Sequence, residues 1–182
     1  MKQYNVGIIG ATGMVGQRFA TLLENHPWFN VKVLAASARS AGKTYEEAVG
    51  ERWAMTTPMP ESMKNIIIMN ATEDIQKIAG MVDFCFCAVD MKKDEIKALE
   101  EAYAKAECPI VSNNSSNRHT PYVPMVVPEI NPDHIEVIHA QRKRLGTKRG
   151  FIAVKSNCSI QSYVPALHPL MKFGLKRVLA CT

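Results

Sequence analysis

Short apolar runs alternate along this chain with segments whose apolar residues recur at helical spacing. The apolar runs lie at Tyr4–Ile9, Val31–Ala36, Asn65–Met69, Asp83–Val89, Pro109–Ser112 and Phe151–Val154. Continuous apolar runs of this length are typical of strands that are buried on both faces of a parallel sheet. Because these runs alternate with helical segments, the pattern predicts a doubly wound α/β fold.

Four of the intervening segments have the spacing of helices. One follows Gly13, one spans Asp74–Ala79, one runs from a cap at Asp90 to Ala106, and one spans Ser159–Phe173 with Pro165 and Pro169 inside it. Proline should shorten or kink the last of these. Apolar faces are predicted on the first helix at Val15, Phe19, Leu22 and Leu23, and on the third at Ile96, Leu99, Ala102, Tyr103 and Ala106. No element is predicted for Gly42–Ser62, which is irregular and contains prolines.

A glycine-rich turn joins the first strand to the first helix, with glycines at Gly7, Gly10, Gly13 and Gly16. A dinucleotide-binding, Rossmann-like fold begins with strand, glycine turn and helix in this order. The glycines let the backbone turn tightly and approach a pyrophosphate, and the N–H groups of the new helix hold that anion. The spacing is G-x-x-G-x-x-G rather than the commoner G-x-G-x-x-G, so a glycine turn without a ligand is the alternative.

The end of the second strand indicates which dinucleotide would bind. An NAD site usually places Asp or Glu about 20 residues beyond the glycine turn, where it binds the ribose 2′-hydroxyl. Here the segment holds Ser37, Ala38, Arg39 and Ser40, and no acid. The guanidinium of Arg39 and the two hydroxyls suit a phosphate, so we predict NADP rather than NAD. A solvated loop arginine is the alternative.

The catalytic site is predicted at Ser156-Asn157-Cys158-Ser159, between the strand Phe151–Val154 and the last helix. Cys158 would stand at a helix N-terminus, whose positive end favours the nucleophilic thiolate, and nearby N–H groups could stabilise an oxyanion. The other cysteines, Cys85, Cys87, Cys108 and Cys181, lie in or beside apolar runs and are predicted to be buried structural residues.

Two other kinds of catalytic site, a Cys–His hydrolase and a metal site, have weaker support in the sequence. A Cys–His hydrolase would need His168, which lies ten residues beyond Cys158, about 15 Å along a straight helix. His119, His134 and His139 are predicted to lie at the surface or in an interface. Cys85 and Cys87 share one face of a strand, but no second pair of ligands has zinc spacing, so no metal site is predicted.

The loop Ser112–His119 (SNNSSNRH) is polar and follows a predicted strand. Its amides, its hydroxyls and the guanidinium of Arg118 suit an anionic substrate or a phosphate. A solvated asparagine–serine loop is the alternative.

Composition narrows the function classes. The chain has 182 residues, 47% of them hydrophobic, which supports one full core and part of a second. The net charge is +5, and five basic residues lie in RKRLGTKR at 142–149. No aromatic residues interleave with this cluster, so it is predicted to be a solvated connector and not a nucleic-acid site. No signal peptide or membrane span is visible, and the five cysteines are expected to be reduced thiols in the cytoplasm.

The chain resembles the N-terminal half of aspartate-semialdehyde dehydrogenases, in particular the branch found in archaea and fungi. The matching segments are GATGMVGQRF (10–19), SAR (37–39), VPEINPDH (127–134) and SNCS (156–159). Related N-acetyl-glutamyl-phosphate reductases typically have glycine rather than asparagine before the cysteine. Malonyl-CoA reductases of the same branch are not separated by these residues.

The resemblance implies a covalent mechanism. Cys158 would attack an aldehyde to give a thiohemiacetal, hydride would pass to NADP, and phosphate would release the resulting thioester as an acyl phosphate. The biosynthetic direction is the reverse, reducing aspartyl phosphate on the route to lysine, threonine and methionine. Asn157 would orient the substrate and Arg118, with Asn117, would bind the phosphate or acyl-phosphate group. Thr12, Met14 and Val15 would line the pyrophosphate turn.

Members of the resembled family are about twice as long, which predicts that this chain is an N-terminal fragment. Residues 1–155 would form the NADP-binding domain, and 156–182 would begin an α+β catalytic domain. The remainder would hold a substrate-binding arginine, an acid/base histidine and most of the interface of a homodimer or homotetramer. The fragment alone should bind NADP weakly and not turn over. Two alternatives stay open, namely a malonyl-CoA reductase-like acylating dehydrogenase and a stand-alone, non-catalytic NADP-binding module.

Overall fold

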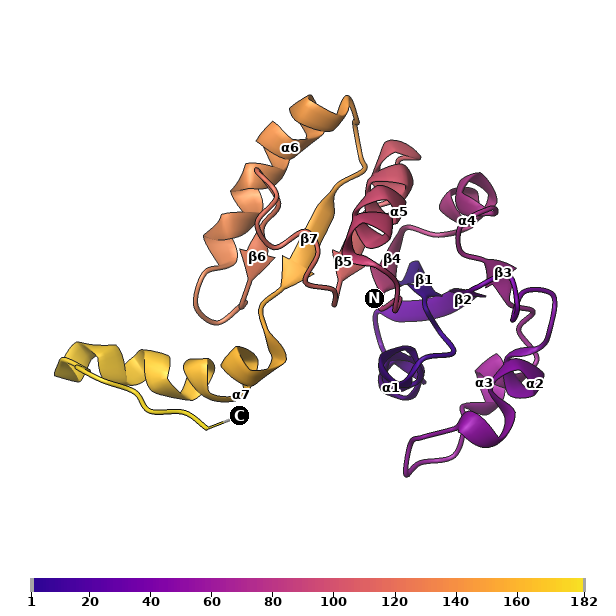
Figure 1. Ribbon diagram of the computed structural model, residues 1–182, viewed down its shortest axis with the longest axis horizontal. Coiled ribbons are helices and arrows are strands. Elements are labelled where there is room, and N and C mark those ends of the chain that lie inside the picture. The colour runs from indigo at the N-terminus through magenta and orange to yellow at the C-terminus, as the bar shows by residue number, and fades with distance from the viewer. Residues whose placement is uncertain (1, 182) are drawn as a thin grey trace.

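The computed structural model describes residues 2–181, which form a seven-stranded parallel sheet flanked by helices (Figure 1). The strand order is β3-β2-β1-β4-β5-β7-β6. The strands are β1 (Tyr4–Ile9), β2 (Phe29–Ala36), β3 (Met69–Asn70), β4 (Phe84–Cys87), β5 (Ile110–Ser112), β6 (Met125–Val126) and β7 (Ile152–Lys155). The order reverses between β1 and β4, which is where open parallel sheets bind ligands, beyond the carboxyl ends of the strands. The predicted doubly wound fold is therefore confirmed.

The helices vary in length and include three short 3-10 segments. They are α1 (Met14–Leu23), α2 (Tyr45–Val49), η1 (Gly50–Arg52), α3 (Glu61–Lys64), α4 (Ile75–Met81), α5 (Lys93–Lys105), η2 (Pro132–Val137), α6 (Ile138–Leu145), α7 (Cys158–Leu167) and η3 (His168–Phe173). Within residues 2–181, none of the helices is long and apolar enough to cross a membrane.

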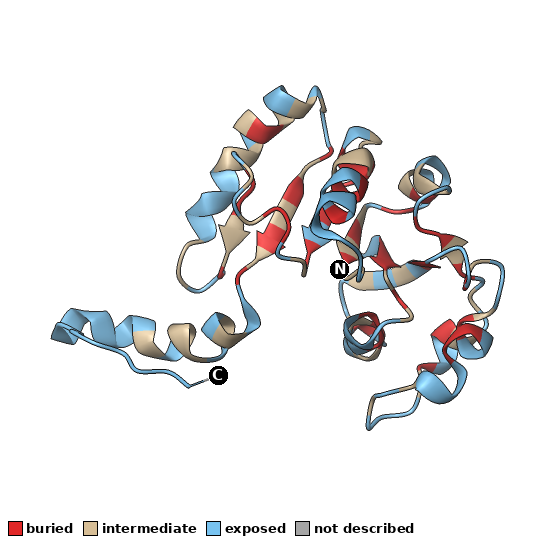
Figure 2. Ribbon diagram, viewed as in Figure 1, coloured by how far each residue is buried: buried red, intermediate tan, exposed pale blue. Residues whose placement is uncertain are grey.

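Two apolar clusters pack on the two faces of the sheet. Figure 2 shows buried residues on the strands and on the helices that flank them. On one face, Ile78 of α4 and Leu99 and Tyr103 of α5 contact strand residues such as Cys85 and Ile110. On the other face, α1, α2 and α3 cover β1 and β2. The strands β1, β2 and β4 thus present side chains to both clusters, which is why their sequences read as continuous apolar runs.

Several predicted boundaries shift in the structure. The strand expected at Asn65–Met69 is β3, of which only Met69 lies in that range, because Ile67 instead forms an isolated antiparallel bridge with Thr44. The predicted cap at Asp90 is wrong, since α5 begins at Lys93. Its N-terminal backbone is held by Glu95, whose carboxylate accepts the N–H of Lys92 at 3.3 Å.

The buried face of α5 also differs from the prediction. Ile96, Leu99 and Tyr103 are buried as expected, whereas Ala102 and Ala106 are only half-buried. Glu100 and Ala104 take their places. The buried carboxylate of Glu100 is hydrogen-bonded to polar side chains at the end of β5 and in the loop that follows it.

Two regions without predicted elements are folded. The irregular stretch 42–62 contains α2 and η1 and runs into α3, while β6, η2 and α6 occupy residues 125–145. The basic cluster at 142–149 is not a simple connector, because Arg142, Lys143 and Arg144 lie in the last turn of α6, where positive charge is favourable. Arg142 also stacks over the ring of Phe151, 5.2 Å from its centroid.

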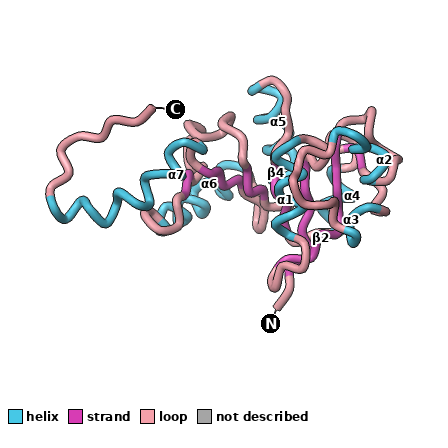
Figure 3. Tube along the Cα trace, turned by 90° about the horizontal axis from the view of Figure 1, so that it is seen from below, coloured by secondary structure: helices cyan, strands magenta, loops and turns pink. Residues whose placement is uncertain are grey.

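The C-terminal segment lies apart from the sheet (Figures 1 and 3). The predicted helix 159–173 is split, since α7 ends at Leu167 and η3 continues to Phe173, with Pro165 inside α7. Cys181 is exposed, which corrects the prediction of a buried structural residue. Its apolar neighbours Leu179 and Val178 are themselves exposed, so no core forms around it.

Candidate active site and cofactor crevice

The glycine turn between β1 and α1 is fixed by close backbone contacts. Gly10 has φ +87°, and a Cβ there would lie 2.5 Å from the carbonyl oxygen of Ala88. A Cβ at Gly16 would lie 2.2 Å from the carbonyl oxygen of Gly10. Both positions therefore require glycine for folding. Gly13 differs, because its Cβ would meet the Gly10 oxygen only at 3.5 Å, an ordinary contact distance.

The N-terminus of α1 is open to a ligand. Gly13 is the N-cap residue, and within the described chain no side chain caps the helix. The first N–H groups of α1 are thus available to an anion, aided by the positive end of the helix. Met14 and Val15 are exposed there, with relative exposures of 68% and 41%.

A crevice of about 550 Å³ lies beside this turn, at the carboxyl ends of β1, β2 and β4. Its wall includes the predicted cofactor residues Gly10, Thr12, Gly13, Ser37 and Arg39. Four other predicted residues are not in this wall: Met14, Val15 and the buried Gly16 belong to α1, and the buried Ser40 faces a neighbouring pocket.

The neighbouring pocket is basic and has a volume of about 360 Å³. Arg39, Ser40, Lys43 and Arg52 line it, and Arg39 and Arg52 also line the larger crevice. Sequence reasoning missed Lys43 and Arg52, because they lie in the stretch for which no element was predicted. Both residues are basic in the sequence, but no local pattern indicated that they line the same pocket as Arg39.

Two side chains tie this stretch to the glycine turn. The Tyr45 hydroxyl donates to the carbonyl of Ala11 at 3.0 Å, and burial raises the pKa of Tyr45, so the hydroxyl keeps its proton. The buried amide of Gln17 donates to the carbonyls of Thr12 at 3.1 Å and Arg52 at 3.0 Å. The backbone of Arg52 is thereby held beside the turn.

Cys158 stands where the sequence placed it, at the first position of α7, with two residues between it and the end of β7. It is exposed. Asn157 is the N-cap residue, and its side chain accepts the N–H of Ser159 at 2.9 Å. This contact begins the helix at the cysteine, so the thiol lies at the positive end of the helix dipole.

Arg118 comes to the same strand end from 37 residues away along the chain. Its Nε donates to the carbonyl of Lys155 at 3.1 Å, and its Nη2 donates to the carbonyl of Ser156 at 3.1 Å. The loop Ser112–His119 and the segment before Cys158 are therefore joined through one guanidinium. The sequence pointed to Arg118 and Cys158, and the structure joins Arg118 to the backbone two and three residues before Cys158.

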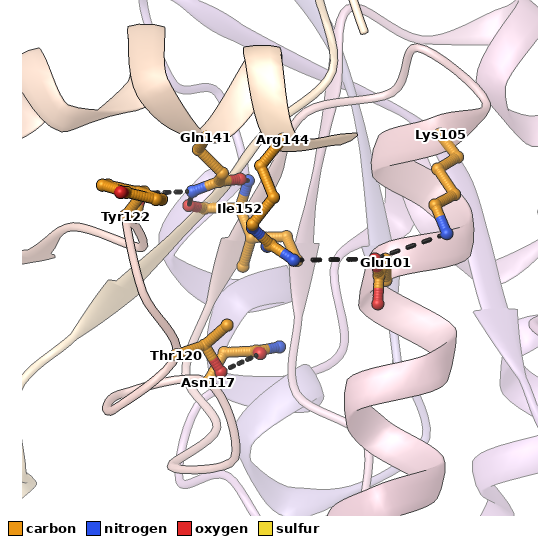
Figure 4. A network of polar contacts seen from close by, with 8 residues as sticks. All are labelled: Glu101, Lys105, Asn117, Thr120, Tyr122, Gln141, Arg144 and Ile152. Atoms are coloured by element: carbon orange, nitrogen blue, oxygen red, sulfur yellow. Dashed lines mark hydrogen bonds and ion pairs between the residues drawn. The ribbon is translucent and has the colours of Figure 1, made fainter. Parts of the chain in front are cut away.

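A buried carboxylate supports that loop from beneath. Glu100 is fully buried, and its oxygens accept from the hydroxyl of Ser112, from the amide of Asn114 at 3.2 Å and from the amide of Asn117 at 2.6 Å. The Asn117 Oδ1 accepts from the Thr120 hydroxyl at 2.8 Å (Figure 4). Asn117 is thus buried and engaged at both ends of its amide, and its role in substrate binding stays a prediction.

Polar contacts also hold α6 against β7. The Gln141 amide donates to the carbonyls of Tyr122 at 2.8 Å and Ile152 at 2.9 Å, so it joins three separate segments (Figure 4). Arg144 lies 3.8 Å from Glu101 of α5, which also pairs with Lys105 at 3.3 Å. These contacts position the strand that ends at the site.

The histidines and the other cysteines lie elsewhere. His119, His134 and His139 are exposed, and His168 begins η3 at the far end of α7. Cys85, Cys87 and Cys108 are buried, as predicted. Across residues 2–181, no group of three or more His, Cys, Asp or Glu side chains could hold a metal ion.

The reversal of strand order beside a glycine turn, the open N-terminus of α1 and the crevice at the strand ends define a dinucleotide-binding protein of the Rossmann class. Comparison with known families narrows the class. The model for the NAD-binding domain of semialdehyde dehydrogenases matches residues 5–138, and the chain belongs to this family.

Individual proteins similar to this chain belong to the same family. The chain is 40% identical over 172 residues to an aspartate-semialdehyde dehydrogenase of Aspergillus fumigatus, a match that covers 92% of this chain and 45% of the relative. It is also 40% identical over 179 residues to that of Methanothermobacter thermautotrophicus, covering 98% and 49%. The crystal structure of the Candida albicans enzyme with NADP superposes with a TM-score of 0.81 at 36% identity, covering 94% and 48%. The chain spans about half the length of the relatives it matches.

Proposed function

We propose that this chain supplies the cofactor crevice and the nucleophile of an NADP-dependent aspartate-semialdehyde dehydrogenase, which reduces aspartyl phosphate to aspartate semialdehyde. The observation that supports the proposal best is the place of Cys158, at a strand end and a helix N-terminus, with Arg118 bonded to the backbone just before it. The relatives named above carry this activity in their names.

The crevice fits NADP on two observations. Gly13 lines the crevice, and its lack of a side chain lets a pyrophosphate approach the backbone. Folding does not require glycine at this position, because a Cβ would meet its nearest atom at an ordinary contact distance. Arg39, Lys43 and Arg52 together give the adjoining pocket three positive charges, which suit a 2′-phosphate better than a hydroxyl. When bound, the reduced cofactor supplies the hydride of the reaction.

Cys158 would act as the nucleophile. Its thiolate attacks the acyl carbon of aspartyl phosphate, a C–S bond forms, the C–O bond to phosphate breaks, and inorganic phosphate leaves. Arg118 keeps three of its five N–H donors after its two backbone contacts and would hold the departing phosphate. Asn157 would orient the acyl group, and the N–H groups at the start of α7 would stabilise the oxyanion.

The working protein is inferred to be a homodimer or homotetramer in the cytoplasm. Support for association comes from the apolar side chains that η3 and the following segment leave exposed, among them Met171, Phe173 and Leu179. Support for the compartment comes from the five free cysteines.

Trapping the acyl-enzyme tests the proposal directly. The purified chain is incubated with β-aspartyl phosphate, and peptide mass spectrometry should find one aspartyl group on Cys158. Cys158→Ser should lose the adduct, while Cys181→Ser should keep it. An adduct formed from malonyl-CoA and not from β-aspartyl phosphate would favour the acylating-reductase alternative. NADP binding without any adduct would favour a non-catalytic module.

A further inference from the structure

Two cations converge on one backbone oxygen beside the proposed nucleophile. The Lys155 ammonium donates to the carbonyl of Ser156 at 3.2 Å, and Nη2 of Arg118 donates to the same oxygen at 3.1 Å. Ser156 lies two residues before Cys158. The two positive groups therefore lie together at the carboxyl end of β7, where α7 begins.

This pair of charges has no carboxylate partner among the residues that the structure describes, since every ion pair found there involves other side chains. Burial lowers the pKa of the Lys155 ammonium, the nearby Arg118 lowers it further, and Cys158 opposes both. Two like charges held close together are unfavourable unless an anion lies between them. The arrangement thus indicates a site for an anion.

The remaining donors suit a doubly charged group. Lys155 keeps two N–H donors after its contact with Ser156, and Arg118 keeps three. A planar guanidinium fits two oxygens of a phosphate, while an ammonium contributes a point charge that follows the third. A phosphate dianion would therefore be neutralised by the two side chains together.

We propose that Lys155 is a second substrate-binding cation, which with Arg118 holds the phosphate group that leaves, or in the reverse direction attacks, the acyl carbon at Cys158. This inference rests on the proposed function for the identity of its ligand. Sequence reasoning did not select Lys155, because a lysine at the end of a strand has no motif of its own.

Alkylation of Cys158 in the 182-residue chain tests the anion site without requiring turnover. Iodoacetate is an anion and iodoacetamide is neutral, so the ratio of their rates reports the charge beside the thiol. The fraction of thiolate cancels in this ratio. Cys181, which is also exposed, provides an internal reference in the same peptide map. We expect a higher ratio at Cys158 than at Cys181, and inorganic phosphate should slow the reaction of Cys158 with iodoacetate.

Lys155→Met should lower the Cys158 ratio about threefold to tenfold and weaken the protection by phosphate. Lys155→Arg keeps the charge and should retain both effects, which separates charge from packing. Lys32→Met removes an exposed lysine from the amino-terminal half of β2 and should change neither. An unchanged ratio in a folded Lys155→Met protein would overturn the proposal, as would a loss of ratio in Lys155→Arg equal to that in Lys155→Met.

The outcome is separable from that of the proposed function. If no aspartyl adduct forms but phosphate still protects Cys158 through Lys155, the anion site stands and the reaction assigned to it does not. If the adduct forms at an equal rate in Lys155→Met and the ratio is unchanged, the reaction stands and the role of Lys155 does not.

Discussion

Replacing Gly13 by alanine should leave folding nearly unchanged while it weakens dinucleotide binding. Gly13 has φ −78° and ψ 163°, which alanine adopts without strain, and the new Cβ would lie 3.5 Å from the nearest backbone oxygen. Alanine is a poorer N-cap than glycine by about 0.5 kcal/mol, and the reduced entropy of the unfolded chain offsets about the same amount. The net change in the free energy of unfolding should therefore stay within about 0.5 kcal/mol.

Binding should respond much more strongly. Gly13 lines the crevice, so the methyl group would stand where the pyrophosphate must approach the N–H groups of α1. Losing one hydrogen bond to a charged group costs about 1.5–3 kcal/mol, which corresponds to roughly a tenfold to hundredfold rise in Kd. Calorimetric titration with NADP measures this change, and thermal unfolding without the ligand measures stability.

Two other glycines give the opposite pattern and serve as comparisons. Alanine at Gly16 would place Cβ 2.2 Å from a backbone oxygen, and alanine at Gly10 would add a positive φ to a similar clash. Each should destabilise the fold by about 1–3 kcal/mol or more. Gly80→Ala, in α4 with no atom within 4 Å, should stabilise by up to about 1 kcal/mol. The reasoning is refuted if Gly13→Ala destabilises as much as Gly16→Ala, or if it binds NADP as tightly as the parent chain.

Three further predictions concern other parts of the fold. Backbone N–H groups of residues 148–150 lower the pKa of the Glu107 carboxylate from 4.5 to about 2, so its stabilising contribution is complete above pH 4.5 and is lost as the pH falls towards 2. Glu107→Gln should remove that part of the pH dependence in acid titrations followed by circular dichroism. Arg52→Ala should weaken NADP binding about tenfold and leave NAD binding unchanged, and equal losses for both cofactors in parallel titrations would contradict its assignment to the 2′-phosphate. Tyr45→Phe removes the bond to Ala11 and should cost about 1–2 kcal/mol in urea unfolding, with a cost below about 0.3 kcal/mol counting against a structural role.

The elements that sequence reasoning found share a physical cause. β1, β4, α1 and α5 can be predicted from short stretches of the chain, because apolar periodicity and turn-forming residues act over only a few positions. The place of Cys158 was predicted for the same reason, since a strand, a polar cap residue and a helix follow one another within a few residues. The missed elements α2, β6 and α6 are short or weakly apolar and contact distant segments: Tyr45 of α2 bonds to Ala11, β6 pairs with β7, and Gln141 of α6 bonds to Ile152.

The sequence by itself thus determined the alternation of the longer strands and helices, the glycine turn, and the place of Cys158 between a strand and a helix. Only the tertiary structure decided that Arg52 returns to Arg39, that Arg118 and Lys155 share one carbonyl oxygen, and that a fully buried Glu100 holds the loop before Arg118. The physical reason is that these pairings depend on how the chain closes over long separations. Such closure is set by the packing of whole elements against the sheet, and no local pattern of residues encodes it.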